Sequence, residues 1–259
     1  MNPTSSTRSA LVLFTTLTLL ATGCGGEPGA GAETAAGVDT AAAALKAVGI
    51  SSLTISSPTV TAGNSITATV TLSGAAESAS GGVFVYVTFR NTILAGPKFV
   101  RIPNGMRSAT FTLYSNPFLS ASASTSVSAT TSSPNPASFA SQNLFVIPSS
   151  TPPTSAAPQV SSLTLSPPAV KSGSPSTGTV TLTAPAPASG AVVQLSNSGD
   201  FFNLDADLPP VLVIPAGATT ATFPIRTHLS NGLIDSVDEI VVGNYFGGAY
   251  RGAYLSITR

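Results

Sequence analysis

The stretches Ser51–Ser56 (SSLTIS) and Ser161–Ser166 (SSLTLS) decide the fold that this sequence predicts. In each stretch, apolar residues alternate with Ser or Thr. A period of two is typical of a β-strand that buries one face and exposes the other. The two stretches are nearly identical and lie at an offset of 110 residues, which indicates an internal duplication.

The match between the two copies continues along the chain. Thr69–Leu72 (TVTL) matches Thr179–Leu182 (TVTL) at the same offset, whereas Ile102–Gly105 (IPNG) matches Ile214–Gly217 (IPAG) at an offset of 112. The drift of two residues places small insertions in loops between strands. Alternation predicts that the following apolar residues face a core: Leu53, Ile55, Ile66, Ala68, Val70, Leu72, Val83, Val85, Val87, Ala109, Phe111, Leu113, Val193, Leu195, Ala221, Phe223 and Ile225.

Each copy therefore contains six or seven short strands in about 100 residues, a density typical of an antiparallel Greek-key β-sandwich. We expect an all-β protein with two tandem sandwiches, at residues 50–147 and 159–259, joined by a Pro/Ser/Thr-rich linker at 148–158. Pro103–Gly105 and Pro215–Gly217 are turn signals between strands. Pro224 lacks a backbone donor, so we expect it at a sheet edge or a bulge.

Composition excludes several classes of protein. Only 8% of residues are charged, and 10 Lys and Arg balance 10 Asp and Glu, so no basic footprint for nucleic acid is present. The 37 Ser and 33 Thr replace charges as the polar residues. One Cys excludes a disulfide scaffold and a Cys-based zinc cluster, and one His excludes a multi-histidine metal site.

The first 23 residues are expected to be an export signal, because Arg8 precedes an apolar run from Ala10 to Leu20. The run ends in Leu20–Cys24 (LATGC), which resembles the lipobox of bacterial lipoproteins. This resemblance implies that Cys24 is acylated, anchors the chain to a membrane, and becomes the mature N-terminus. Gly25, in the place where Asp would retain the protein, implies the outer membrane or the cell surface. A Gly/Ala-rich tether at 24–49 would follow.

The second copy resembles the Ig-like β-sandwich repeats of bacterial secreted and surface proteins. The resemblance is closest in Val160–Pro167 (VSSLTLSP), Ser176–Leu182 (STGTVTL), Gly190–Val193 (GAVV) and Ile214–Phe223 (IPAGATTATF), and it extends more loosely to the first copy. Such domains serve as stalks, spacers or adhesive modules and have no catalytic residues. The resemblance therefore implies a structural or adhesive role, with a cell-surface protein or polysaccharide as partner. The Cys and Trp of antibody domains are missing.

The second copy also partly resembles the calcium-binding Calx-β repeat, in Gly199–Phe201 and Asp235–Glu239. Thr227 and His228 stand where that family has paired acidic residues. Calcium prefers six to eight oxygen ligands. The resemblance implies a calcium site in loops of the second copy, and the same loops could instead bind a cell-surface glycan. Solvated loop charges explain these residues more simply. The candidate calcium ligands are Asp200, Asp205, Asp207, Asp235, Asp238 and Glu239.

Enzyme activity is not expected. His228 is the only histidine base for a hydrolase, with Asp235 seven residues later, and no Gly-x-Ser-x-Gly elbow is present. Charge differs between the copies, since the first carries a net +3 and the second a net −2. Chance among so few charges explains this difference, but so would head-to-tail association or a basic patch that binds anionic polysaccharide. The basic residues of the first copy are Arg90, Lys98, Arg101 and Arg107.

Overall fold

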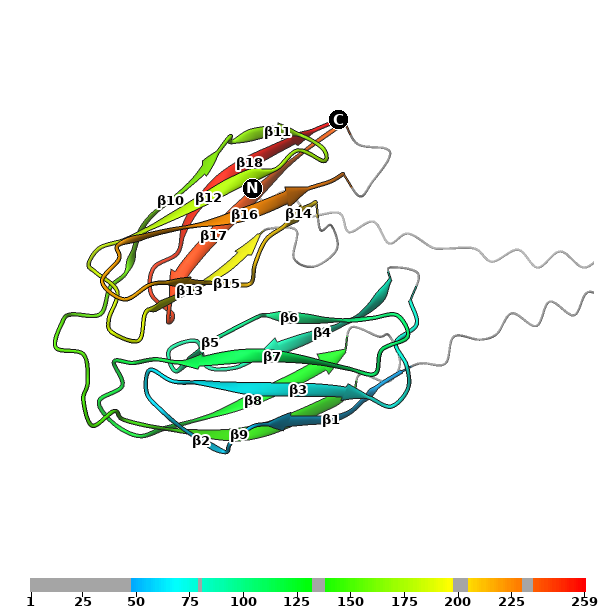
Figure 1. The fold of residues 1–259 in the computed structure, drawn as a ribbon. Helices are drawn as coiled ribbons and strands as arrows, with labels where there is room; N and C mark the ends of the chain where they lie inside the picture. The colour runs from blue at the N-terminus through cyan, green and yellow to red at the C-terminus, as the bar shows by residue number, and fades with distance from the viewer. Residues whose placement is uncertain (1–47, 79–80, 132–137, 198–204, 230–234) are drawn as a thin grey trace, which may run out of the picture. The chain divides into compact units, whose positions relative to one another are not determined.

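A computed structural model describes residues 48–78, 81–131, 138–197, 205–229 and 235–259. All of them belong to one compact unit that spans residues 44–259. The described residues form strands β1 to β18 and no helix, and therefore contain no helix able to cross a membrane (Figure 1). The predicted signal, tether and acylated Cys24 lie outside the described residues.

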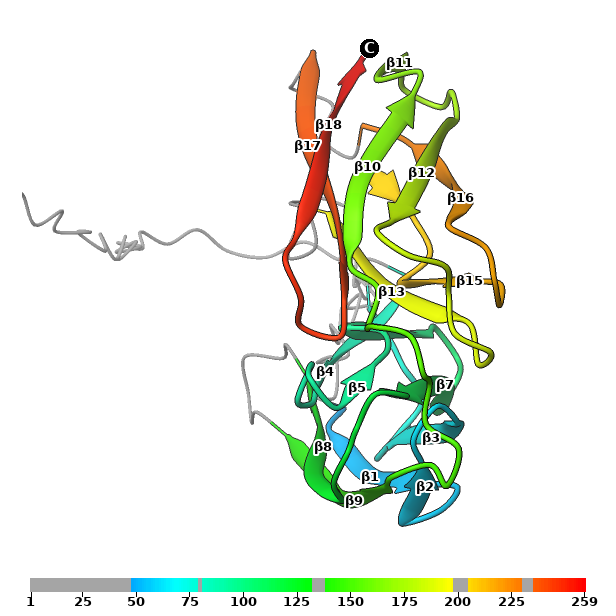
Figure 2. The ribbon, with the colours of Figure 1, turned by 90° about the vertical axis from the view of Figure 1, so that its left-hand side faces the viewer.

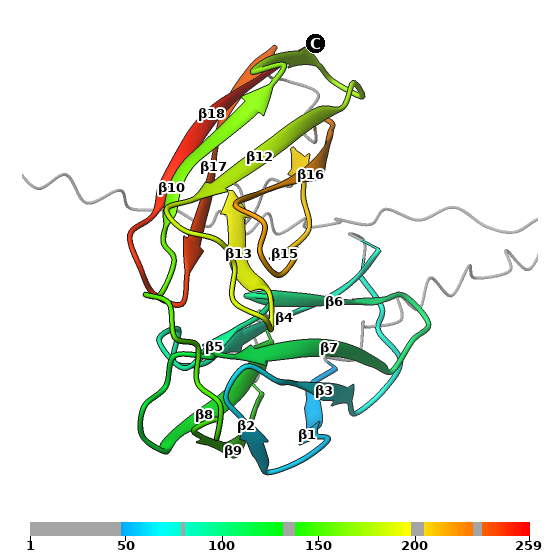
Figure 3. The same cartoon turned by 60° about the vertical axis from the view of Figure 1, so that its left-hand side comes forward.

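The first sandwich consists of two sheets, with strand orders β1-β3-β7-β5 and β2-β9-β8-β4-β6 (Figure 3). The first order corresponds to strands A-B-E-D of an immunoglobulin domain, and β4, β8 and β9 correspond to C, F and G. The strands are β1 (Ile50–Ile55), β2 (Thr59–Thr61), β3 (Ser65–Leu72), β4 (Gly82–Thr88), β5 (Leu94–Ala95), β6 (Phe99–Pro103), β7 (Ser108–Ser115), β8 (Ala123–Thr131) and β9 (Phe139–Ile147).

The second sandwich repeats this topology, with strand orders β10-β12-β16-β14 and β11-β18-β17-β13-β15 (Figure 2). The predicted all-β class and the two tandem sandwiches are confirmed. The strands are β10 (Val160–Ser166), β11 (Ala169–Lys171), β12 (Ser176–Leu182), β13 (Ala191–Asn197), β14 (Ala206–Asp207), β15 (Val211–Ile214), β16 (Thr220–Thr227), β17 (Ser236–Tyr245) and β18 (Arg251–Thr258).

Alternation along the strands builds both cores. In β3, Ile66, Ala68, Val70 and Leu72 are all buried, while the threonines between them face outward. The β-branched threonine suits a pleated surface and presents its hydroxyl to water. For example, the outward Thr69 hydroxyl lies 3.1 Å from that of Thr110 on β7. The low charge content of the chain therefore reflects hydroxyl-covered sheet faces.

In each copy the first strand passes from one sheet to the other. β1 pairs with β3, and after a short break β2 pairs in parallel with β9, so that Thr59 lies opposite Phe145. β10 and β11 make the same switch, and β11 runs parallel to β18. The break in the second copy contains the Ser166–Pro167 cis peptide bond.

The pairing registers locate the insertions that distinguish the two copies. Val83 pairs with Ile102, and Ala191 pairs with Ile214, so the offset in this strand is 108 and not 110. At β5 and β14 the offset is 112, as Leu94 and Ala206 show through their pairing with β7 and β16. It is 114 between β8 and β17 and 111 between β9 and β18. The length differences therefore fall in several loops, including those on both sides of β4 and β13, in agreement with the prediction that insertions lie between strands.

The proline and glycine signals are also confirmed. Gly105 and Gly217 have φ of 81° and 77°, which a residue without Cβ adopts readily, and each sits in the predicted turn. Pro224 pairs with Thr177 of β12, whereas β14 reaches only Arg226 and Thr227 on the other side of β16. Pro224 therefore occupies a local sheet edge, where its missing donor removes no ladder hydrogen bond.

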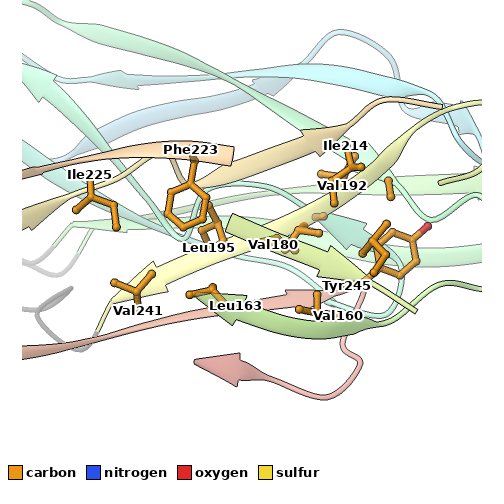
Figure 4. Packing of buried hydrophobic residues seen from close by; sticks show 14 of the residues in the cluster. Val160, Leu163, Val180, Val192, Leu195, Ile214, Phe223, Ile225, Val241 and Tyr245 are labelled. Atoms are coloured by element: carbon orange, nitrogen blue, oxygen red, sulfur yellow. The ribbon is translucent and has the colours of Figure 1, made fainter. Parts of the chain in front are cut away.

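The core of the second sandwich is centred on Phe223, which is 1% exposed. Figure 4 shows Phe223, Leu195 and Val180 directed into the space between the two sheets. Phe223 pairs with Gly178, and a Cβ on Gly178 would lie only 2.1 Å from the Phe223 ring. In the first sandwich, Ala68 pairs with Phe111 instead. Gly178 thus leaves room for the Phe223 ring in the second sandwich.

Candidate functional site

Two of the predicted calcium ligands lie at the short strand β14, with Asp205 directly before it and Asp207 as its second residue. Asp205 is buried, and its backbone oxygen accepts a hydrogen bond of 2.9 Å from the backbone nitrogen of His228. Asp207 is exposed and pairs with Arg226 on β16. The third predicted ligand of this region, Asp200, lies outside the described residues. Because Asp205 points inward and Asp207 outward, their carboxylates do not face a common loop.

The remaining acidic residues belong to β17 and the residue before it. Asp235 is exposed and forms an ion pair of 3.7 Å with Arg259. Asp238 is exposed and Glu239 is buried, so successive residues of this strand point to opposite faces of the sheet. Within the described ranges, no three Asp, Glu, His or Cys residues come together in a way that could hold a metal ion. A calcium site stays a prediction, because Asp200, one of its six candidate ligands, lies outside the described residues.

His228, the proposed hydrolase base, lies one residue beyond the end of β16 and is exposed. Its backbone nitrogen binds the Asp205 backbone oxygen. In the part of the chain that the structure describes, no hydrogen bond joins the imidazole to a hydroxyl that could serve as a nucleophile. His228 therefore occupies an ordinary surface position after a strand.

The basic residues of the first sandwich are largely engaged with their own domain. Lys98 Nζ donates to Asn91 Oδ1 at 3.0 Å and lies 5.3 Å from the centre of the Phe89 ring. Burial lowers the pKa of the Lys98 ammonium group. Arg101 donates to the Gly81 backbone oxygen and packs over the Phe84 ring at 5.9 Å. Cation–π contacts of this kind orient the charges but leave them close to the surface.

Arg107 likewise donates to a backbone oxygen of its own domain, that of Ser73, at 2.9 Å. The described contacts therefore tie Lys98, Arg101 and Arg107 to separate places on the first sandwich, and do not gather them around one acceptor. Arg90 and Arg101 are exposed and leave some positive charge at the surface.

Exposed apolar side chains form a feature that sequence reasoning did not single out. On β9, Phe139, Phe145 and Ile147 are 63%, 52% and 48% exposed, and all three point to the outer face of the sheet. On the equivalent strand β18, Tyr254 is 69% exposed and lies opposite Ile240 of β17. We call these two areas the β9 face and the β18 face.

The sequence did contain a signal for these faces. Phe145 and Ile147 flank the buried Val146, so apolar residues occupy consecutive positions and cannot all point inward. Tyr254 precedes the buried Leu255 in the same way. Exposed apolar clusters of this kind often mark interaction surfaces.

β13 is buried on both of its faces, contrary to simple alternation. Val193 and Leu195 face the sandwich core as predicted, but the outward Gln194 is only 6% exposed. Gln194 Nε2 donates to the backbone oxygen of Gly96 at 2.7 Å. Gly96 belongs to the connection between β5 and β6, so a segment of the first copy covers this strand of the second copy.

An aromatic group lies near the end of β17. Phe118 of the first copy packs edge-to-face with Tyr245, with ring centres 6.5 Å apart, and Tyr245 packs against Phe246 at 4.8 Å. Phe246 has a φ of 38°, in the left-handed region that is uncommon for bulky residues. The Tyr245 hydroxyl is buried, and among the described atoms it has no hydrogen-bond partner. Burial raises the pKa of Tyr245.

No protein-family model matches the chain, and no curated protein matches it. Solved structures with similar backbones include the D00–D0 domain of intimin, at 10% identity and a TM-score of 0.30, covering 82% of this chain and 100% of that one. The periplasmic chaperone SfaE has 12% identity and a TM-score of 0.30, covering 80% and 97%. The CBD12 structure from CALX1.2 has 12% identity and a TM-score of 0.24, covering 78% and 81%.

These likenesses carry no argument about function at such low identities and TM-scores. The class of the protein follows from its own strand order: it is an all-β chain with two tandem Ig-like sandwiches.

Proposed function

We propose that the chain is a lipid-anchored protein of the bacterial cell envelope, whose two sandwiches form a structural or adhesive module without enzymatic activity. The observation that carries the proposal is that both copies expose apolar side chains on, or directly before, the equivalent strands β9 and β18. Phe139 and Tyr250 occupy matching positions at an offset of 111 and are 63% and 58% exposed. Apolar surface that stays exposed in both copies supports a role in contact with a partner surface.

The anchor in this proposal is Cys24. A single acyl chain binds a membrane only marginally, whereas the diacylglyceryl group and amide-linked chain of the lipoprotein family would hold the protein stably. The outer membrane or cell surface is the proposed location, since Gly25 follows the cysteine. The partner is a cell-surface protein or polysaccharide.

Cell fractionation tests the anchor. In Cys24→Ala the acylated group cannot form, so the protein should move from the membrane fraction to the soluble fraction. Thr22→Ala keeps a small residue before the cysteine and serves as the matched control, which should stay in the membrane fraction. Retention of Cys24→Ala in the membrane would contradict the proposed anchor.

An adhesion assay tests the module itself. Tyr254→Ser and Phe145→Ser remove exposed rings without touching the core, so both variants should fold normally and bind cells of the same strain more weakly. Ser126→Ala, an exposed outer-face residue on β8, is the control. Unchanged adhesion in the variant that carries both Tyr254→Ser and Phe145→Ser would show that the β9 face and β18 face do not mediate contact.

A further inference from the structure

The segment between the two sandwiches is unusual among the described residues, because it is their longest stretch without a strand. β9 ends at Ile147 and β10 begins at Val160. Within the described part of the chain, no backbone–backbone hydrogen bond joins residues 150–158 to any other residue. Among the described residues, this segment is therefore a place where an enzyme could bind several consecutive residues in extended form without disrupting a sheet.

The linker exposes hydroxyl groups in a neutral, proline-rich context. Ser150, Thr151, Thr154 and Ser155 are all exposed, and residues 148–158 contain no charged side chain. Prolines at this density favour an extended polyproline geometry. Exposed Ser and Thr among prolines are the composition of O-glycosylated stalks in surface proteins.

Hydroxyls elsewhere in the described structure differ in their surroundings. Those of the strands lie on paired backbone, and the Thr69 and Thr110 hydroxyls also lie 3.1 Å from each other. In the linker, Thr151 Oγ1 lies at a marginal 3.5 Å from Ser149 Oγ, while the Thr154 and Ser155 hydroxyls have no hydrogen-bond partner among the described residues.

The linker also lines a cleft of about 470 Å³ together with three loop segments of the sandwiches, at Ala62–Asn64, Pro117 and Pro187–Ser189. The cleft wall consists of proline rings, hydroxyl groups and the Asn64 amide, and it contains no charged residue. A cleft of this volume is within the range of small-molecule sites. Its neutral lining suits a sugar, which offers hydroxyls to polar groups and C–H surface to proline rings.

From these observations we infer that the linker is a site of O-glycosylation, with Thr151, Thr154 and Ser155 as the acceptors. The acceptor hydroxyl oxygen attacks the anomeric carbon of a glycosyl donor, which is a sugar linked to a nucleoside diphosphate or a polyprenyl phosphate. The new carbon–oxygen bond forms as the bond between the anomeric carbon and the phosphate oxygen breaks. The nucleoside diphosphate or polyprenyl phosphate leaves, and the hydroxyl proton passes to a base of the transferase. This inference goes beyond the proposed function, since neither an anchor nor an adhesive face requires it.

Mass spectrometry of the protein purified from its own cells tests the inference. Trypsin releases the linker within one peptide, Ser108–Lys171, because no Lys or Arg lies between Arg107 and Lys171. We expect this peptide to be heavier than the same peptide made by cell-free synthesis, by whole sugar residues. Fragmentation should place the added mass on Thr151, Thr154 or Ser155.

Variants make the assignment specific. The triple variant Thr151→Ala, Thr154→Ala and Ser155→Ala should give a peptide of unmodified mass, whereas Thr110→Ala, an exposed strand hydroxyl, should leave the added mass unchanged. An unmodified wild-type peptide, or sugar found on strand hydroxyls and absent from the linker, would overturn the inference.

The same digest separates this inference from the proposed function. The peptide Cys24–Lys46 reports acylation, since no other Lys or Arg lies between Arg8 and Lys46. An acylated Cys24 with a bare linker would refute glycosylation and leave the anchor intact. A glycosylated linker without acylation at Cys24 would refute the anchor and leave the glycosylation inference intact.

Discussion

Gly178 is the position where the second core is most sensitive to one added carbon atom. A Cβ there would lie 2.1, 2.4 and 2.6 Å from three atoms of the Phe223 ring. Ordinary carbon–carbon contacts are about 3.5 to 4.0 Å. Phe223 is 1% exposed, so the ring has no open space into which it could move. We therefore expect Gly178→Ala to destabilise the second sandwich.

The magnitude follows from two opposing terms. Overpacking a tight core costs about 1–3 kcal/mol. Replacing Gly with Ala restricts the unfolded chain and returns about 0.4–1 kcal/mol. Gly178 is not among the positive-φ glycines, so its backbone adds no further strain. The net expectation is a loss of about 1–2 kcal/mol in the free energy of unfolding, which lowers the Tm by roughly 2–8 °C in a unit of this size.

Urea denaturation followed by circular dichroism measures this loss as a lower midpoint with an unchanged m-value. Phe223→Leu shortens the ring side chain, so the double variant Gly178→Ala/Phe223→Leu should lose less than the sum of the two single variants. Such coupling between contacting residues is typically about 0.5–3 kcal/mol. Ala68→Gly, at the matching position of the first sandwich, is the control and should not couple to Phe223→Leu. A Gly178→Ala variant as stable as the wild type, or strict additivity, would refute the packing argument.

Three further outcomes are expected. Gln194→Ala leaves the buried Gly96 oxygen without its 2.7 Å donor and should lower the free energy of unfolding by about 1–3 kcal/mol, which calorimetry would register; no change would show that water replaces the donor. Tyr245→Phe removes a buried hydroxyl without a described partner, so its Tm at pH 7 should equal or exceed that of the wild type. Because burial raises the pKa of Tyr245, wild-type stability should fall as pH rises above about 10, where the unfolded chain ionises, and Tyr245→Phe should fall less; parallel curves would contradict this. Calcium titration should leave the Tm unchanged, since the described acidic residues do not converge, and a calcium-dependent rise that Asp200→Asn abolishes would instead support a site that includes Asp200.

The inward faces of the strands could be predicted from the sequence because alternation is a local property. Ile66 to Leu72 and Phe223 to Ile225 lie where the period of two places them. The turns at the glycines and the edge position of Pro224 could be predicted equally well, since the conformational limits of these residues act within a few residues. The alignment of the two copies strand by strand could not, because the offset of 108 between Val83 and Ala191 depends on loop lengths that do not alter the alternation.

The candidate site could be predicted only in part, since acidic residues in sequence do not reveal which way their side chains point. Asp238 and Glu239 are adjacent, yet the pleat sends one to the surface and the other into the protein. Asp205 is buried and Asp207 is exposed although they lie two residues apart, a difference that alternation does not predict. Convergence of several carboxylates requires loops from different strands to meet, and alternation within one strand contains no information about that.

The outer faces of the two copies differ, and this difference bears on function. At an offset of 111, Phe145 and Ile147 of β9 match Ser256 and Thr258 of β18, whereas Tyr254 of β18 matches Asn143 of β9. Phe139 and Tyr250 are exposed rings at matching positions in both copies. On β3 and β12, by contrast, the outward residues carry serine or threonine hydroxyls. Each copy therefore exposes apolar side chains of its own in this sheet, which favours contact with another surface over a purely passive spacer.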